Sequence, residues 1–283
     1  MGRILETTAL TEAQLEGART LADNCNLYES LDYLHPTRDM ASHGNHFHHY
    51  DNVKLTGFLS FPFNGVSEPE AFVIVDPQHR RRGIGRALLD AARESCKRRG
   101  IQQFLLVSEE KSVSGKAFAE ALGGKCKYSE YRLRLEGKPP KPAETTISLR
   151  QADDGDVNTL ARLMADSFEN PIENHLERLK RDIHSLSHRF YVASLVEERI
   201  GCIGVVAEDR RVYVIAFGVL AQYRGHGYGR QILTRTVNGL VAENWEDILI
   251  ETETTNRAAL SLYKSCGFTE TTSYNYYAIR TDN

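Results

Sequence analysis

Two short runs of glycine and arginine carry residue types that bind phosphate. The second run follows an apolar segment and reads Arg224-Gly225-His226-Gly227-Tyr228-Gly229-Arg230. The first turn of a helix has backbone N–H groups without partners, and the helix dipole makes that end positive. Glycine has no Cβ, so ligand oxygens can approach the backbone closely. The run therefore predicts a site for an anionic diphosphate, with a turn that only bends the chain as the alternative.

The glycine-rich run occurs twice, which reveals an internal repeat. Val75 and Val219 are 144 residues apart, and the earlier run, copy one, contains Val75, Arg80, Arg81, Arg82, Gly83, Ile84, Gly85 and Arg86. The same spacing aligns residues 104–107 with 248–251 and Gly123 with Gly267. Three matches at one spacing indicate a duplicated domain.

The elements that must position these runs follow the same order in both copies. In copy two, strands are predicted at 147–149, 190–196, 200–207, 212–219 and 248–251, with a helix over 157–164. A helix with one apolar face follows the glycine-rich run, and the alternation of Tyr277 and Ile279 predicts a closing strand. Strands and helices mixed in this way indicate an α/β or α+β domain, repeated.

A proline-rich segment separates the two copies. Pro139, Pro140 and Pro142 cannot continue a helix or a central strand, and they favour an extended spacer. We therefore predict an N-terminal domain over 1–137, a linker over 138–145 and a C-terminal domain over 146–283.

The spacing within the runs distinguishes the candidate ligands. A P-loop requires GxxxxGK[ST] and a dinucleotide fold requires GxGxxG, and neither copy has either pattern. What remains, Arg224-x-x-Gly227-x-Gly229 and its counterpart in copy one, resembles the pyrophosphate-binding signature of the GNAT acyltransferase superfamily. The resemblance implies two tandem GNAT domains, an arrangement similar to mycothiol synthase, each with a mixed, mostly antiparallel sheet flanked by helices. It also implies acetyl-CoA as cosubstrate.

The resemblance assigns residues to acetyl-CoA. In copy two these are Phe217, Gly218, Val219, Arg224, Gly225, His226, Gly227, Tyr228, Gly229, Arg230 and Asn256. The amides of residues 217–219 would polarise the thioester carbonyl. A possible second CoA site in copy one comprises Val75, Arg80, Arg81, Arg82, Gly83, Ile84, Gly85 and Arg86.

Residues 251–268 resemble the second GNAT motif, Asn-x-x-Ala-x-x-x-Tyr-x-x-x-Gly-Phe. Acetylation of an amine needs a group that accepts the amine proton and one that protonates the leaving thiolate. The resemblance, which includes the spacing in bacterial N-terminal peptide acetyltransferases, makes Tyr263 the general acid and Glu251 the general base. Glu253 is the reserve base. Each residue also has a structural alternative. Asn256 could cap a helix, Tyr263 could be a core residue, and Glu251 could be a solvated strand end.

Copy one lacks the two proposed catalytic groups. The spacing of 144 aligns Glu251 with Val107 and Tyr263 with Ala119. Its phosphate turn is intact, so we expect copy one to be catalytically degenerate while still able to bind CoA. The histidines at 43, 46, 48 and 49 come without a cysteine pair or an HExxH pattern, so they predict an ordinary strand and no metal.

Composition narrows the class of protein. The net charge of −3 gives no reason to expect nucleic acid as a partner, and no apolar run approaches the ~18 residues of a membrane span. Five scattered cysteines and the absence of a secretory signal predict a cytoplasmic protein.

The predicted function is transfer of an acetyl group from acetyl-CoA to a primary amine of a small molecule or a peptide. Residues 23–45 and 168–188 are expected to line the acceptor site. Acidic residues close to the catalytic candidates could attract a cation or form a solvated surface: Glu243, Glu246, Asp247, Glu251 and Glu253. A non-catalytic acyl-CoA sensor and a structural duplicate that binds no acetyl-CoA are the competing functions.

Overall fold

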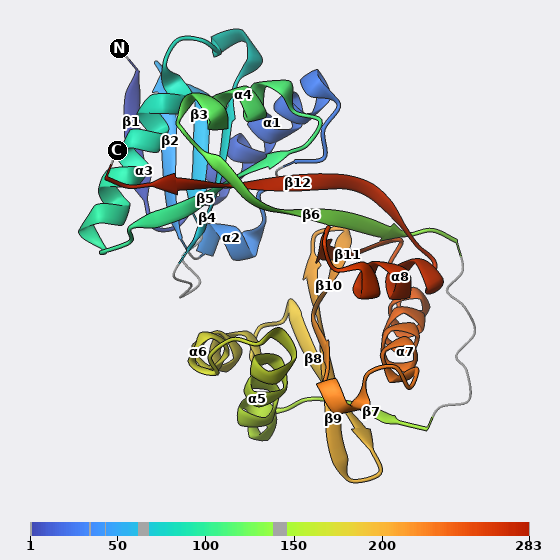
Figure 1. The fold of residues 1–283 in the computed structure, drawn as a ribbon. Helices are drawn as coiled ribbons and strands as arrows, with labels where there is room; N and C mark the ends of the chain where they lie inside the picture. Colours follow the sequence, from blue (N-terminus) through green and yellow to red (C-terminus); the bar gives the residue numbers. More distant parts are fainter. Residues whose placement is uncertain (1, 34, 43, 62–67, 138–145, 283) are drawn as a thin grey trace. The chain divides into compact units, whose positions relative to one another are not determined.

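The computed structural model describes residues 2–33, 35–42, 44–61, 68–137 and 146–282. The chain forms two compact units (Figure 1). Unit 1 contains Met1–Glu130 and Thr272–Asn283, and unit 2 contains Tyr131–Thr271. The units thus differ from the predicted domains, 1–137 and 146–283, at their ends. The predicted linker, 138–145, lies outside the described residues.

Unit 1 is built on a sheet in the order β1-β2-β3-β4-β5-β12. The β4–β5 pair is parallel, and the β1–β2, β2–β3, β3–β4 and β5–β12 pairs are antiparallel. The strands that begin in copy one are β1 (Arg3–Thr7), β2 (Asn45–Asp51), β3 (Lys54–Phe61), β4 (Glu70–Val75), β5 (Gln103–Glu109) and β6 (Lys125–Leu135).

Helices cover both faces of the unit 1 sheet. Successive strand residues point to opposite faces, so Phe58 packs with α1 while its neighbour Leu59 packs with α3. Thr11 and Gln14 form a capping box that starts α1. The helices are α1 (Glu12–Glu29), α2 (Arg38–Ser42), α3 (Ile84–Arg98) and α4 (Val113–Ala121), with a 3₁₀ turn at Pro77–His79.

Unit 2 repeats this design with a sheet in the order β6-β11-β10-β9-β8-β7. The β10–β11 pair is parallel, and the pairs from β10 to β7 are antiparallel. Its strands after β6 are β7 (Ser148–Gln151), β8 (His188–Leu195), β9 (Glu198–Glu208), β10 (Arg211–Val219) and β11 (Asp247–Glu253).

In unit 2, α5 and α6 lie on one side of the sheet, and α7 and α8 on the other (Figure 1). Cys202 faces the first pair and Ile203 faces the second. The helices are α5 (Val157–Phe168), α6 (Glu173–Asp182), α7 (Tyr228–Ala242) and α8 (Arg257–Ser265), with 3₁₀ turns at Asp154–Asp156 and Ala221–Tyr223. The predicted mixed, mostly antiparallel sheets flanked by helices are confirmed in both units.

The last strand of each copy is exchanged. β12 (Phe268–Arg280) is the counterpart of β6 at the repeat spacing of 144 residues. Yet β12 pairs with β5 from Tyr274↔Glu109 to Arg280↔Gln103, and β6 lies next to β11. Unit 1 is therefore completed by the C-terminal end of the chain, and residues 131–135 belong to unit 2.

Of the four histidines predicted to lie in a strand, those at 46, 48 and 49 lie in β2, and His43 lies outside the described residues. His46 and His48 are fully buried against Phe58, and they hydrogen-bond to Ser60 and Thr7 respectively. Over the described residues, no group of three or more His, Cys, Asp or Glu side chains is placed to hold a metal ion.

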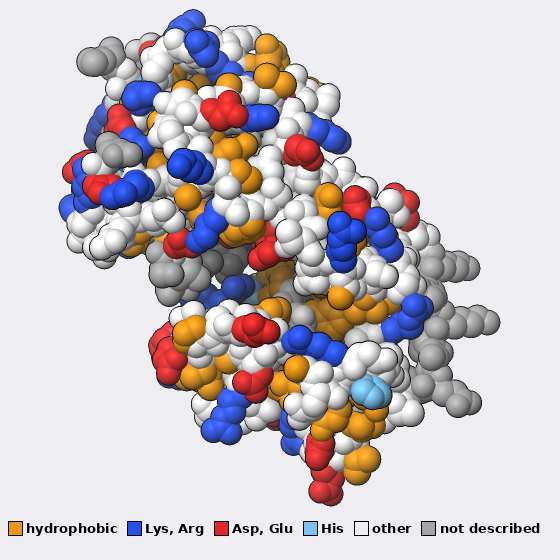
Figure 2. Space-filling model, viewed as in Figure 1, with side chains coloured by type: hydrophobic (Ala, Val, Ile, Leu, Met, Phe, Trp, Pro, Cys, Tyr) orange, Lys and Arg blue, Asp and Glu red, His pale blue; other side chains and the backbone are white. Residues whose placement is uncertain are grey.

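The surface carries charges of both signs. On the face drawn in Figure 2, basic and acidic side chains are interspersed and do not gather into one basic area. Within the described ranges, no helix is long and apolar enough to cross a bilayer.

Candidate functional site

The glycine-rich turn of unit 2 leads directly into α7 and leaves the start of that helix open. Gly227 is the N-cap residue, with φ of 81°, and no side chain caps the helix there. A Cβ added at Gly225 or Gly227 would meet no atom within 4 Å. The unpaired amides of the first turn therefore face open space, which suits an anion.

The turn of unit 1 has the same shape. Gly83 caps α3 with φ of 80° and no side-chain hydrogen bond. Arg81 stands where unit 2 has Gly225, and it keeps the left-handed backbone, with φ of 63°. Holding a non-glycine residue in this region costs free energy, on the order of 1 kcal/mol. The surrounding turn therefore imposes this shape in spite of the substitution.

The arginine that opens each turn binds the strand before it. Arg224 Nε donates to the carbonyl of Val219 at 2.8 Å, and Arg80 Nε donates to the carbonyl of Val75 at 3.1 Å. Both bonds span five residues, so each arginine ties the turn to the end of its strand. This structural role was absent from the sequence prediction, in which Arg224 supplies charge to a diphosphate; that role remains a prediction.

The last glycine of each turn allows two helices to pack closely. A Cβ on Gly229 would lie 3.2 Å from Leu262 of α8, and one on Gly85 would lie 3.3 Å from Phe118 of α4. At the end of the unit 2 run, Arg230 donates to the carbonyl of Ser265, and the His226 ring stacks on Tyr228. These contacts fix α8 against the start of α7.

Strands β10 and β11 separate beside the turn. Their parallel pairing runs from Arg211↔Asp247 only to Val214↔Ile250. A bulge between Ile215 and Gly218 and a positive φ of 49° at Ala216 bend β10 there. The β11 side of residues 215–219 is therefore without a strand partner, including the predicted carbonyl-binding segment 217–219.

Tyr263 lies behind this opening. Its ring is 6% exposed and contacts Phe217 of β10, with ring centroids 6.2 Å apart, and Phe268. Among the described residues, no hydrogen-bond partner binds its hydroxyl. Burial raises the pKa of the Tyr263 hydroxyl, so this group stays protonated at neutral pH. The structure thus brings the end of β10, the start of α7 and helix α8 together. The residues that meet there are Phe217, Val219, Gly229, Leu262 and Tyr263.

Glu251 is held by an arginine that the sequence prediction missed. Arg132 of β6 donates through Nε to Glu251 Oε1 at 2.8 Å, and its guanidinium lies over the Tyr213 ring at 5.5 Å. Among the described residues, no hydrogen bond reaches Oε2 of Glu251, whose side chain is 33% exposed. That oxygen remains available to an amine or a water. No direct contact joins Glu251 to Tyr263.

The other candidates of the second motif also have defined places. Asn256 caps α8 by accepting a hydrogen bond from the amide of Ala259 at 3.1 Å, which confirms its structural alternative. Its amide NH₂ remains a possible donor to a pantetheine arm. Glu253 is exposed and accepts a hydrogen bond from Thr255.

Most of the expected acidic surface is paired with arginine. Glu243 binds Arg189, and Asp247 binds both Arg134 and Arg211. Together with the Arg132 pair of Glu251, these contacts reduce the negative charge that the sequence offers to a cationic acceptor. Glu253, which lies within the second motif, is exposed.

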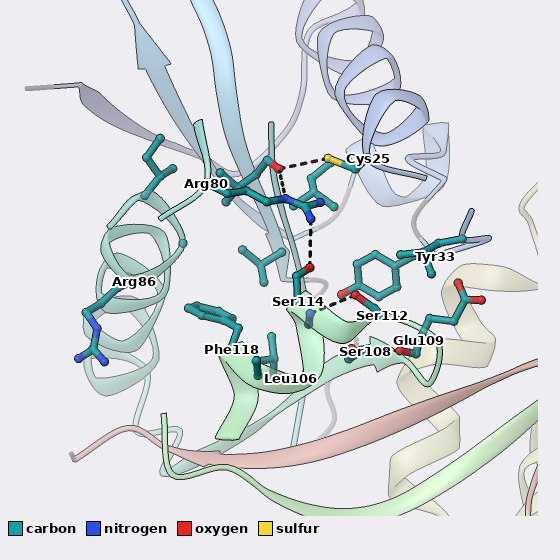
Figure 3. A pocket seen from close by; sticks show the side chains of 18 of the residues that line it. Cys25, Tyr33, Arg80, Arg86, Leu106, Ser108, Glu109, Ser112, Ser114 and Phe118 are labelled. Carbon is teal, nitrogen blue, oxygen red and sulfur yellow. Dashed lines mark hydrogen bonds between the residues drawn. The ribbon is translucent and has the colours of Figure 1, made fainter. Parts of the chain in front are cut away.

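Unit 1 contains a cavity of about 300 Å³ beside its own turn (Figure 3). It is lined by residues of α1, β4, α3, β5 and α4, among them Cys25, Arg80 and Phe118. Val107 and Ala119, which replace the proposed base and acid, are both buried. Ser112 replaces Asn256 and caps α4 in the same way, through the amide of Gly115.

A carboxylate from α1 is fixed at the edge of this cavity. Glu29 accepts hydrogen bonds from Ser112 at 2.9 Å, from Ser114 at 2.6 Å and from Arg80. Burial alone would raise the pKa of Glu29, but the hydrogen bonds from Ser114, Arg80 and Ser112 outweigh burial and lower it. Glu29 therefore remains ionised and ties α1 to α4.

The two units define a tandem pair of α/β domains, each with an open helix start next to a pair of separating strands. The model of the acetyltransferase (GNAT) family matches residues 7–123 and 157–268. The chain belongs to this family, and it contains the family's domain twice.

Individual relatives show how far the likeness extends. The chain is 26% identical over 140 residues to N-alpha-acetyltransferase 30 of Mus musculus, covering 47% of this chain and 38% of that protein. It is 27% identical over 222 residues to mycothiol acetyltransferase of Clavibacter sepedonicus, covering 72% and 71%. The chain thus spans well under half the length of the first of these relatives.

One solved structure repeats the tandem fold. The tandem GNAT protein from the clavulanic acid biosynthesis pathway, 18% identical, superposes with a TM-score of 0.70 over 99% of each chain. At this identity the likeness concerns the fold, and it agrees with the tandem GNAT arrangement predicted from the repeat.

Proposed function

We propose that this chain is an N-acetyltransferase that moves an acetyl group from acetyl-CoA directly to a primary amine, with the reaction in unit 2. The observation that carries the proposal is the position of Tyr263. Its protonated hydroxyl has no partner among the described residues, and its ring packs on Phe217 where β10 leaves β11.

Residues of unit 2 fit acetyl-CoA along its length. The open amides at the start of α7, with the positive-φ glycines 225 and 227, suit the diphosphate. The unpaired side of residues 217–219 can donate to the thioester carbonyl, which stabilises the negative charge that develops there. The NH₂ group of Asn256 can bind the pantetheine arm.

The proton transfers need one donor and one acceptor. Tyr263 can protonate the sulfur of the leaving thiolate, because its hydroxyl carries a proton at neutral pH and its ring lies beside Phe217 at the opening. The Oε2 atom of Glu251 can accept a proton from the amine, directly or through water, while Arg132 holds Oε1. Glu253 is the reserve base, since it is exposed and its carboxylate accepts one hydrogen bond, from Thr255, among the described residues.

The acceptor class follows from the paired charges. Because Glu243, Asp247 and Glu251 are bound by arginines, a strongly cationic polyamine is a poorer fit than an amine with one positive charge. The names of the relatives refer to two kinds of acetylation, at an α-nitrogen and in mycothiol. We propose a primary amine with one positive charge, in a small molecule or at a peptide N-terminus.

The direct test is the substitution Tyr263→Phe, assayed by thiol release with a panel of amines. We expect kcat to fall at least tenfold while the KM for acetyl-CoA changes little, since the ring contact with Phe217 is kept. The matched control is Tyr277→Phe, because Tyr277 is as buried as Tyr263 but lies in unit 1. Unchanged turnover in Tyr263→Phe would remove this residue from the mechanism, and no thiol release with any amine would contradict the proposed activity.

A further inference from the structure

In unit 1, the side chain of Tyr33 lies where strands β4 and β5 separate. The parallel pairing of β4 and β5 ends at Ala71↔Leu106, so these strands separate as β10 and β11 do. Tyr33 enters the opening: its hydroxyl donates to the carbonyl of Val107 at 2.5 Å, and Tyr33 and Val73 both line the cavity there. At the repeat spacing of 144 residues, Val73 corresponds to Phe217 and Val107 to Glu251.

The backbone beside Tyr33 is held on three sides. The amide of Tyr33 donates to Asn26 Oδ1 at 3.2 Å, and the amide of Asp32 donates to Glu109 Oε2 at 2.8 Å. Tyr274 of β12 donates its hydroxyl to the carbonyl of Asp32 at 2.5 Å. The Tyr33 ring also contacts Phe72, with ring centroids 6.1 Å apart. Moving the backbone that carries Tyr33 would therefore break several hydrogen bonds at once.

Space for a long, narrow ligand remains between Tyr33 and the turn. The cavity of about 300 Å³ extends from Arg81 and Gly83 at the start of α3 to Tyr33 and Glu109. Figure 3 shows the Tyr33 ring pointing into it from one side, with Arg86 on the opposite side of the view. The walls are mainly apolar, which suits the methylene groups of a pantetheine arm, and Arg82 and Arg86 are exposed at the phosphate end.

Unit 2 has no comparable obstruction among its described residues. No side chain there makes a hydrogen bond to the backbone of Phe217 or Glu251, the counterparts of Val73 and Val107. The difference between the units is therefore specific to the acyl end, because the turns at the phosphate end have the same geometry.

We propose that unit 1 binds CoA with a free thiol and excludes acetyl-CoA. The acetyl group adds three non-hydrogen atoms at the sulfur, and the Tyr33 side chain already occupies the opening beside Val73 and Val107 that those atoms would need. Unit 1 is then a binding site for the product of the proposed reaction. The inference rests on the proposed use of acetyl-CoA by the chain, but it does not depend on turnover.

The test measures binding to each unit separately in the full chain. The exposed pair His226 and Arg230 in unit 2 corresponds to Arg82 and Arg86 in unit 1 at the spacing of 144. The double substitution His226→Glu/Arg230→Glu removes binding to unit 2, and Arg82→Glu/Arg86→Glu removes binding to unit 1. Calorimetry with CoA and with acetonyl-CoA, which cannot be hydrolysed to CoA, then gives the affinity of the remaining site.

In the His226→Glu/Arg230→Glu protein, we expect CoA to bind at least tenfold more tightly than acetonyl-CoA. Adding Tyr33→Ala should bring the two affinities within threefold, whereas adding Tyr33→Phe, which keeps the ring, should preserve most of the difference. If Tyr33→Ala fails to fold, the affinities of CoA and acetonyl-CoA for the His226→Glu/Arg230→Glu protein still test the inference. Equal affinities, or no CoA binding to unit 1, would overturn the inference.

Turnover distinguishes this inference from the proposed function. Thiol release by the wild-type chain with no CoA binding to unit 1 would refute the inference alone. Selective CoA binding to unit 1 in a chain that acetylates no amine would refute the proposed reaction alone.

Discussion

His46 and His48 titrate in a way that makes this protein sensitive to mild acid. Burial lowers the pKa of both imidazoles to about 4, from an ordinary value of 6.5, and the neighbouring His48 adds to this effect on His46. Each ring has one nitrogen without a hydrogen-bond partner among the described residues, Nε2 of His46 and Nδ1 of His48. Both are therefore neutral in the folded protein.

The sign of the pH dependence follows from these values. In the unfolded chain, these two histidines take up protons as the pH falls through about 6.5. In the folded chain, they do so only near pH 4. Stability is therefore complete above pH 6.5 and declines as the pH falls to about 4, by up to about 1.4 kcal/mol per pH unit for each histidine. Urea unfolding at pH 7, 6, 5 and 4.5 would measure this slope.

Replacing one histidine tests the assignment. His48→Leu should reduce the slope between pH 6.5 and 4.5 by the share of one histidine, up to about 1.4 kcal/mol per pH unit, even if it lowers stability at pH 7. His184→Leu, at an exposed histidine in unit 2, is the control and should leave the slope unchanged. An unaltered slope in His48→Leu would show that other groups cause the acid sensitivity.

Single residues also show where sequence reasoning ends. The phosphate turns could be predicted because their function depends on local spacing, Arg-x-x-Gly-x-Gly before a helix. Tyr33 and Arg132 could not, because each acts through a partner far away in the chain, 74 residues for Val107 and 119 for Glu251. Neither residue belongs to a motif that marks it.

At the scale of elements, β6 gives the proposed active site a residue from the end of copy one. Arg132 on β6 binds Glu251 on β11, and its counterpart on β12 is Tyr276, which lies in unit 1. Without the exchange of the two strands, this position beside β11 would hold a tyrosine. The carboxylate would then have no guanidinium from this strand.

Arg132 is thus a positioning residue for the proposed base. We expect Arg132→Met to lower kcat about tenfold with little change in the KM for acetyl-CoA, since the phosphate turn is untouched. Arg132→Lys should restore part of the loss, because a cation returns. The control is Arg134→Met, which removes an ion pair to Asp247 on the same two strands. Equal losses in Arg132→Met and Arg134→Met would indicate a general effect on the sheet instead.

The elements of copy two could be predicted well because their patterns are local. The strands predicted at 190–196, 200–207 and 212–219 are present as β8, β9 and β10, with ends that differ by at most two residues. The partner of β12 could not be predicted. β6 and β12 are duplicates, so the alternation of apolar and polar residues in each strand suits the edge of β5 and the edge of β11 equally. This alternation does not specify which of the two edges each strand joins.

At the scale of the whole molecule, the exchange makes each unit depend on residues from the other copy. Leu133 and Tyr277 are counterparts at the spacing of 144 residues, and both are buried. Leu133, which belongs to copy one, packs in the core of unit 2 with Ile248 and Phe268. Tyr277, which belongs to copy two, packs in the core of unit 1 with Phe104 and Ala119.

This pair of residues allows a reciprocal test of the exchange. Tyr277→Ala should destabilise unit 1 and Leu133→Ala should destabilise unit 2, each by about 2–5 kcal/mol, because each leaves a cavity in a packed core. Hydrogen exchange read by mass spectrometry would locate the loss of protection. We expect it in β5 for Tyr277→Ala and in β11 for Leu133→Ala. If each copy instead completed its own sheet, the pattern would reverse, with Tyr277→Ala exposing β11, since the strand that carries the mutation would then lie beside the other parallel pair.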